Sequence, residues 1–291
     1  MTKKVAVSIS GGGEKGAYGV GVVKYLIEVM DLRVDTWVGV SVGALIGSLM
    51  CQYSEEEKLA ASAELERIFT TVKTEDIHEG WFLGYLGAAL FSKPSLRCTK
   101  PLRELIDKHL DEDRVRVSGK EFRCGAVSMT SGNYEVFTEQ TIMLKKAVEA
   151  SASFPFMFEP VRMDSEWYAD GGVRSVTPIK AAIDAGADVI YAVTLQPEEP
   201  EDEYPSKPVW HDAAIRTLDL QSEAIIAKDI KLAQAYTRLA NAGIGSKKPV
   251  EIHHIRPAKT LPTTLLEFNP EEAKKLVEMG YADAKRILGG E

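Results

Sequence analysis

The sequence predicts an α/β fold with a mostly parallel central sheet and helices on both faces. The chain opens in the order β-α-β-α, with strands expected over 5–9 and 36–40 that are apolar throughout. Such strands are typical of parallel sheets that are covered on both faces. With 291 residues, 45% hydrophobic and 27% charged, the chain is long enough for one large core. We expect a single domain over 1–291, with the motif-bearing core in 5–180 and residues 181–291 completing it.

The remaining elements follow from hydrophobic periodicity, capping residues and turns. Helices are expected over 17–30, 44–50, 54–69, 101–110, 144–151, 179–185 and 212–242, with a last helix from Asn269. Further strands are expected over 122–127, 134–138, 167–169, 189–195 and 250–255. The start of the helix over 54–69 is placed at Ser54, a capping residue followed by acids. Four prolines and five acids in 197–208 predict a mobile acidic surface loop.

Composition excludes several classes of protein. The net charge of −8 argues against a nucleic-acid partner. The three cysteines are widely spaced, which is typical of free thiols in a reducing compartment. The first apolar run is too short for a signal peptide, and the run over 81–91 is too short to span a bilayer. We therefore expect a cytoplasmic protein that touches a membrane only peripherally.

The segment Gly39-Val40-Ser41-Val42-Gly43 is a G-x-S-x-G motif. A bare motif of this kind arises often by chance. Here, however, an expected strand precedes it and an expected helix follows it. A serine on a sharp strand-to-helix turn projects its hydroxyl from the backbone, and the flanking glycines allow the tight turn. This context favours Ser41 as the nucleophile of an acyl hydrolase.

The run Gly11-Gly12-Gly13-Glu14-Lys15-Gly16 follows the first strand. Successive glycines let backbone N–H groups form a concave nest, and the next helix adds its positive end, so the run is a candidate oxyanion loop. It also satisfies the G-x-G-x-x-G pattern of dinucleotide-binding folds. That fold needs an acid at the end of the second strand, whereas Asp35 precedes it. This weakens the dinucleotide alternative, and a plain glycine-rich turn is a further one.

The base is harder to assign. Of the five histidines, His253 and His254 fit the order serine, acid, histidine, but they lie side by side in an expected strand and point to opposite faces. Asp170-Gly171-Gly172 follows another expected strand, where a carboxylate is able to take the serine proton directly. An Asp-Gly hairpin turn is the alternative. The residues alone leave these alternatives open.

Four ordered blocks resemble the patatin-like phospholipase family. They are the loop from Gly11, the elbow around Ser41, the segment 150–161 and the Asp170-Gly171-Gly172 triplet. The resemblance implies a three-layer sandwich and a Ser41–Asp170 dyad that works without a histidine. It further implies an oxyanion held by the N–H groups of Gly12 and Gly13, no metal or cofactor, and lipid acyl esters as substrates.

Three further features have competing interpretations. The apolar run 80–91 is a flap over the acyl pocket, a patch that touches a lipid surface, or a buried helix. Lys15 attracts a lipid phosphate, balances Glu14, or is a solvated lysine at a helix start. The whole chain is a hydrolase or a non-catalytic lipid-binding protein on the same fold. The sequence does not indicate an oligomeric state.

Overall fold

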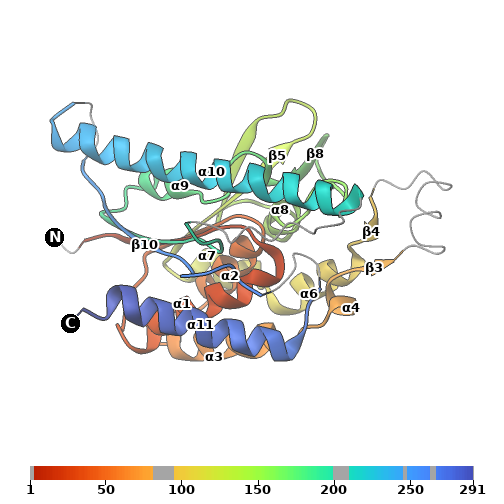
Figure 1. Cartoon of the computed structure of the whole chain (residues 1–291), viewed down its shortest axis with the longest axis horizontal. Coiled ribbons are helices and arrows are strands. Elements are labelled where there is room, and N and C mark those ends of the chain that lie inside the picture. The colour runs from red at the N-terminus through yellow and green to blue at the C-terminus, as the bar shows by residue number, and fades with distance from the viewer. Residues whose placement is uncertain (1–2, 81–94, 199–209, 245–247, 263–266, 291) are drawn as a thin grey trace.

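The computed structural model describes residues 3–80, 95–198, 210–244, 248–262 and 267–290, and for 210–215 it describes the backbone alone. The apolar run 80–91 and the acidic loop 197–208 therefore lie almost entirely outside the described residues. Within the described chain, a mixed sheet is covered by helices on both faces (Figure 1).

Eight strands form the central sheet, in the order β10-β9-β1-β2-β5-β8-β7, with β6 also paired to β5. Their bounds are β1 Val5–Ile9, β2 Thr36–Gly39, β5 Glu121–Ser128, β6 Tyr134–Thr138, β7 Val161–Met163, β8 Glu166–Asp170, β9 Val189–Val193 and β10 Glu251–Ile255. The pairs from β10 to β5 are parallel, whereas β6 and β8 run antiparallel to β5, and β7 antiparallel to β8. The predicted, mostly parallel sheet is confirmed.

The helices and short elements between the strands account for most of the remaining described chain. They are η1 Gly13–Lys15, α1 Gly16–Glu28, α2 Val42–Cys51, α3 Lys58–Phe69, α4 Thr74–Ile77, α6 Lys100–His109, α7 Glu112–Val117, α8 Leu144–Ser151, η2 Gly171–Val173, α9 Ile179–Asp184, α10 Trp210–Asn241 and α11 Pro270–Leu288. A small antiparallel pair, β3 Glu79–Gly80 and β4 Arg97–Cys98, lies beside α4 and α6.

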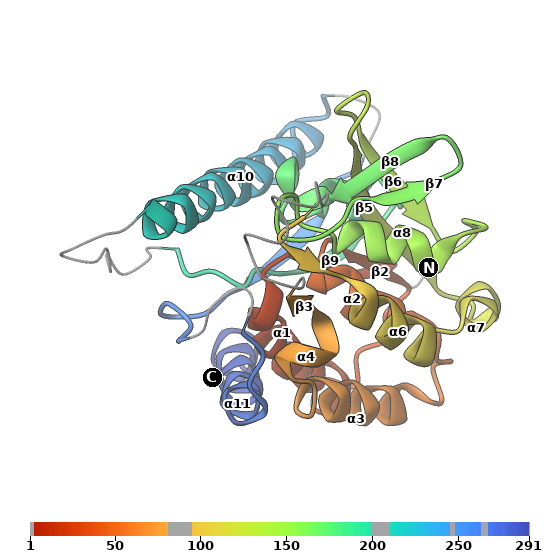
Figure 2. The same ribbon diagram turned by 90° about the vertical axis from the view of Figure 1, so that its right-hand side faces the viewer.

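The helices form two layers with the sheet between them. Figures 1 and 2 show α10 on one side of the sheet and α1, α3 and α11 on the other. Strand β1 explains the division, because alternate side chains of a strand point to opposite faces. Ala6 packs with α9 and α10, whereas Val7 and Ile9 belong to the larger cluster that includes α1, α2 and α11. The predicted three-layer arrangement is confirmed.

Two predictions of local structure need correction. The helix expected from Ser54 begins at Lys58, because residues 54–57 form a turn in which the N–H groups of Glu57 and Lys58 donate to carbonyls three residues earlier. The short helix α7 was not predicted. It begins where the Asp111 carboxylate accepts the N–H groups of Asp113 and Arg114. The predicted cap of the last helix is confirmed, since the Asn269 side chain accepts the Glu271 N–H.

The strand pairing brings three loops to one place. Ile9 and Gly39 are in register on β1 and β2, so the loops that follow both strands begin side by side. On β5, Cys124 pairs with Gly39 of β2, and Ala126 pairs with Asp170 of β8. Because β6 pairs along 123–127 on the other edge of β5, β2 and β8 must share one edge. Their carboxyl ends therefore meet head to head.

Candidate active site

Ser41 occupies a strained turn between β2 and α2. Its backbone adopts φ 56° and ψ −128°, a conformation that costs a non-glycine residue about 1–3 kcal/mol. The flanking glycines cannot be replaced without a clash. A Cβ on Gly39 would lie 2.1 Å from the Gly43 carbonyl oxygen, and one on Gly43 would lie 2.2 Å from that of Ile9. Val40 and Val42 flank Ser41 in this turn between β2 and α2.

The Asp170 carboxyl lies at the end of β8 and is only 1% exposed. Burial raises the pKa of this carboxyl to about 7, against the opposing effect of hydrogen bonds from the Gly172 N–H and the Ser41 hydroxyl. The Gly172 N–H donates to Asp170 Oδ1 at 2.7 Å. Asp170 therefore caps η2, which starts at Gly171, and the alternative of a simple Asp-Gly hairpin is wrong.

The glycine loop packs directly against the elbow. A Cβ on Gly11 would lie 3.1 Å from the Ser41 Cβ, and one on Gly16 would lie 2.2 Å from Val42 Cγ2. The Gly11 N–H donates to the Val176 carbonyl at 3.1 Å. In the part of the chain that the structure describes, the N–H groups of Gly12 and Gly13 donate to no protein acceptor. Two donors are thus available close to Ser41.

Glu14 and Lys15 leave the loop in different directions. Glu14 is 3% exposed and accepts the Asn269 N–H at 2.9 Å. Its burial raises the pKa to about 7. Lys15 is 9% exposed, and burial lowers its pKa against the attraction of Asp219 and Glu223 in α10. Because Lys15 is buried, the interpretation as a solvated lysine is wrong. Within the described residues no ion pair joins it to Glu14.

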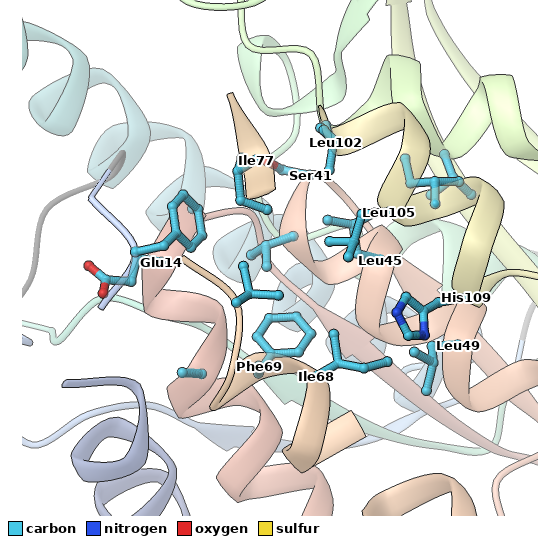
Figure 3. Close-up of a pocket in the computed structure, with 18 of the residues that line it drawn as sticks. Glu14, Ser41, Leu45, Leu49, Ile68, Phe69, Ile77, Leu102, Leu105 and His109 are labelled. Carbon is cyan, nitrogen blue, oxygen red and sulfur yellow. The ribbon is translucent and has the colours of Figure 1, made fainter. Parts of the chain in front are cut away.

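An apolar cavity opens beside Ser41 and has a volume of about 110 Å³. Its walls come mainly from α2, α3 and α6, with the start of α11 at one side (Figure 3). Of the predicted site residues, the cavity is lined by Gly13, Glu14, Ser41 and Val42. The apolar lining includes Leu45, Leu49, Ile68, Phe69, Ile77, Leu102 and Leu105. Such a space suits a hydrocarbon chain better than a polar group.

The two histidines of the expected strand over 250–255 have other partners. His253 stacks on Tyr191 and lies 3.0 Å from Glu251. His254 contacts Thr194 Oγ1 at 3.0 Å, and burial lowers its pKa to about 4. Both residues lie on β10, which β9 and β1 separate from β2. As expected for adjacent residues of a strand, the two rings have different neighbours.

Comparison with known families adds an independent finding. A sequence model of the family described as patatin-like phospholipase matches residues 7–183, which is more than half of the chain. The chain belongs to the patatin-like phospholipase family. The matched region includes the glycine loop, the elbow and Asp170, which the fold brings together.

Two viral proteins are similar to this family member over part of their length. One, from Invertebrate iridescent virus 6, is named "Probable lipid hydrolase 463L" and is 25% identical over 183 residues, which cover 60% of this chain and 62% of that protein. The other, uncharacterized protein R571 of Acanthamoeba polyphaga mimivirus, is 26% identical over 189 residues, 60% of this chain and 59% of that protein. The chain thus spans about six tenths of these curated relatives.

Among solved structures, VipD from Legionella pneumophila superimposes with a TM-score of 0.49 and 16% identity, covering 99% of this chain and 67% of VipD. Within the residues that the structure describes, no helix of this patatin-like chain combines the length and apolar character needed to cross a bilayer. In the same residues, no group of three or more His, Cys, Asp and Glu side chains is placed to hold a metal ion.

Sequence reasoning on this patatin-like chain missed two parts of the site. The first is Ser151, whose Oγ accepts the Ser41 N–H at 3.1 Å. It lies in the segment 150–161 that resembles the family, but no role was assigned to it from the sequence. The second is the α6 wall of the cavity. Its signal was readable, because Leu102, Leu105, Ile106 and His109 have the i, i+3, i+4, i+7 spacing of one helix face.

Proposed function

We propose that this patatin-like chain is a serine acyl-ester hydrolase of lipids in which Ser41 is the nucleophile and Asp170 the base. One observation carries the proposal most directly. The hydroxyl of a serine on a strained elbow lies near a buried carboxyl and opposes the rise of the carboxyl's pKa, at the mouth of an apolar cavity. A nucleophile within hydrogen-bond reach of its base is the geometry that covalent catalysis needs.

In the first step, Ser41 Oγ attacks the ester carbonyl carbon and its proton passes to the Asp170 carboxylate. The base must be ionised to accept a proton, and a pKa of about 7 leaves it a substantial ionised fraction near neutral pH while making it a stronger base than an ordinary aspartate. The hydrogen bond from Gly172 to Asp170 Oδ1 orients the carboxyl toward the serine.

The tetrahedral intermediate carries a negative oxygen that needs donors. The N–H groups of Gly12 and Gly13, without acceptors in the described chain, are assigned to hold it. Preorganised backbone donors of this kind contribute about 2.7–4 kcal/mol each in serine hydrolases. Gly11 packs against Ser41, so the loop is held beside the elbow.

The intermediate collapses when the bond to the leaving alcohol breaks and Asp170 returns the proton to that alcohol. The acyl group then remains on Ser41 Oγ, with its hydrocarbon chain in the apolar cavity. Water attacks the acyl-enzyme while Asp170 takes its proton. The bond from the acyl carbon to Ser41 Oγ then breaks, Asp170 returns the proton to Ser41 Oγ, and the free fatty acid leaves. Phospholipids, lysophospholipids and other lipid esters are the substrate class. The name of the iridescent virus relative, a probable lipid hydrolase, agrees with this class.

Three alternatives make different predictions. A non-catalytic lipid-binding protein would fill the cavity without reacting. A Ser-His-Asp esterase would depend on His253 or His254, whose observed partners are Glu251 and Thr194. A dinucleotide-binding protein would use the glycine loop and show a thermal shift with NAD or ATP.

The test is a panel of lipid esters assayed with wild type and Ser41→Ala, together with labelling by a fluorophosphonate probe. We expect hydrolysis of at least one lipid ester by wild type, labelling at Ser41, and loss of both in Ser41→Ala. A folded wild type that neither reacts with the probe nor hydrolyses any ester would contradict the proposal and favour a lipid-binding role.

A further inference from the structure

Two helix faces form the long walls of the apolar cavity. On α2, the lining residues after Ser41 include Leu45 and Leu49, and on α6 they include Leu102, Leu105 and His109. Figure 3 shows the two rows running the same way, with Leu102 drawn nearest Ser41 and His109 beside Leu49. At 1.5 Å per helical residue, His109 lies about 10 Å further along α6 than Leu102. His109 therefore marks the end of the cavity that is remote from Ser41.

A second hollow lies behind that end. This polar cleft, of about 540 Å³, is lined largely by charged side chains, among them Glu64, Asp107 and Lys108. Two residues line both hollows, namely His109 and Leu110. The apolar cavity and the polar cleft are thus separated by the last residue of α6 and the one that follows it.

The His109 ring lies between the apolar cavity and the polar cleft. Its side chain is 16% exposed, and its Nδ1 lies 3.6 Å from Glu64 Oε1 of α3, a residue of the polar cleft. Burial lowers its pKa, and Lys108 and Arg67 act in the same direction against the attraction of Glu64. A neutral ring of this kind presents an apolar surface to a hydrocarbon chain at little cost.

The backbone under the ring is fixed by Gln52 at the end of α2. Gln52 Nε2 donates to the His109 carbonyl at 2.9 Å, and Gln52 Oε1 accepts the Asp111 N–H at 2.8 Å. One amide side chain thus joins the ends of the two helices that form the walls. Gln52 therefore fixes the backbone that carries the His109 ring relative to α2, the helix that begins after Ser41.

We propose that the His109 side chain closes the far end of the acyl cavity and sets the longest acyl chain that the enzyme accepts. The inference rests on the proposed hydrolase function, because it assigns the cavity to the acyl chain. An extended octanoyl chain is close in length to the roughly 10 Å that separates Leu102 from His109 along α6. A palmitoyl chain is longer and requires the wall to be absent. Shortening His109 to alanine joins the two hollows and gives a longer chain a path into the polar cleft.

The first experiment measures kcat/KM for p-nitrophenyl octanoate and palmitate. The proteins are wild type, His109→Ala, His109→Phe and Lys108→Ala, with thermal unfolding as the control for folding. The palmitate-to-octanoate ratio should rise about tenfold or more in His109→Ala, as expected for a change in pocket contacts. It should stay near wild type in His109→Phe, which keeps a ring, and in Lys108→Ala, which alters an exposed neighbour. A ratio that does not move in His109→Ala, or that rises equally in His109→Phe, overturns the inference.

A second experiment separates this inference from the hydrolase function. In a Ser41→Ala background, octanoate and palmitate compete with a fluorescent fatty acid, with and without His109→Ala. The affinity for palmitate relative to octanoate should rise when His109 is shortened. If wild type hydrolyses no ester and this shift is still observed, the hydrolase function fails while the cavity assignment stands. If esters are hydrolysed and neither readout changes, the role of His109 fails while the hydrolase function stands.

Discussion

The hydroxyl oxygen of Ser151 accepts a hydrogen bond of 3.1 Å from the backbone N–H of Ser41. Two residues later, the Ser153 carbonyl accepts the backbone N–H of Asp170 at 2.9 Å. A single short segment at the end of α8 therefore holds the elbow and the carboxyl-bearing turn. The positive φ of Ser41 is unfavourable on its own, and this shared segment is one of the contacts that stabilise it.

Ser151→Ala should weaken catalysis without weakening substrate binding. Losing one buried hydrogen bond costs about 1 kcal/mol, which corresponds to roughly a fivefold to tenfold fall in kcat. KM should change less than about twofold, since Ser151 does not line the cavity. The matched control is Ser131→Ala, because that serine accepts the Asn133 N–H on an exposed turn and should leave kcat unchanged. A rise in KM with constant kcat would contradict a positioning role for Ser151.

The pH dependence of hydrolysis should follow the Asp170 carboxyl. Its pKa is raised to about 7 by burial, and only the ionised form takes the serine proton. Log kcat/KM should therefore be flat above about pH 7 and fall with decreasing pH below it, by up to a factor of about ten for each pH unit. Glu14 also has a pKa of about 7, so Glu14→Gln is the necessary control and should retain the acid limb. If Glu14→Gln lost the acid limb, the limb would report the Glu14 carboxyl and the assignment to Asp170 would be wrong.

The same carboxyl should lower stability at neutral pH. Between about pH 4 and 7 the unfolded chain ionises Asp170 while the folded chain keeps the proton, so wild-type stability falls as the pH rises through this window. Asp170→Asn does not titrate. Its free energy of unfolding should exceed that of wild type by a margin that grows across the window to on the order of a few kcal/mol and is then constant. Urea unfolding at several pH values measures this difference, and a difference independent of pH would contradict the raised pKa.

Helices α1 and α11 approach each other through glycines. A Cβ on Gly21 would lie 1.9 Å from the Val277 carbonyl oxygen, and one on Gly280 would lie 1.9 Å from that of Tyr18. On the same helix as Gly21, a Cβ on Gly19 would meet only side-chain carbons at 3.4 Å or more. Gly19 and Gly21 therefore lie on the same helix but pack differently, so their substitution to alanine can be compared directly.

Gly21→Ala should lower the free energy of unfolding by about 2 kcal/mol or more, because the helices must move apart. Gly19→Ala should raise it by up to about 1 kcal/mol, because alanine favours the helix. Denaturant unfolding of both variants measures the contrast. Equal effects of the two substitutions would show that the close approach of α1 and α11 does not control stability.

Local sequence patterns were sufficient for most of the fold. The apolar strands β1 and β2 and the capped helix at Asn269 depend on neighbouring residues alone, and each formed where expected. The elbow was equally readable, because Gly39 and Gly43 are required by contacts within a few residues and with β1. The turn at 54–57 was not readable, because a serine followed by acids is typical of a helix start, whereas the Glu57 and Lys58 N–H groups donate to carbonyls three residues earlier.

Contacts between distant segments were beyond the sequence. Nothing local shows that Ser151 faces the Ser41 N–H, 110 residues earlier in the chain. Likewise, a solvated lysine at a helix start was one of the interpretations of Lys15 that the sequence left open, and only the packing around the glycine loop shows that it is buried. His109 shares a helix face with Leu102 and Leu105, but only the placing of α2 and α6 around one cavity shows what that face lines.

Comparison of Asp170→Asn with histidine variants tests the Ser41–Asp170 dyad most directly. kcat/KM for a lipid ester is measured for wild type, Ser41→Ala, Asp170→Asn, His253→Ala and His254→Ala, each checked for folding. The dyad predicts that the Ser41 and Asp170 substitutions each lower kcat/KM by about a thousandfold or more, whereas both histidine variants stay within about threefold of wild type. Activity that survives Asp170→Asn and is lost in His253→Ala or His254→Ala would contradict the dyad and establish a histidine base.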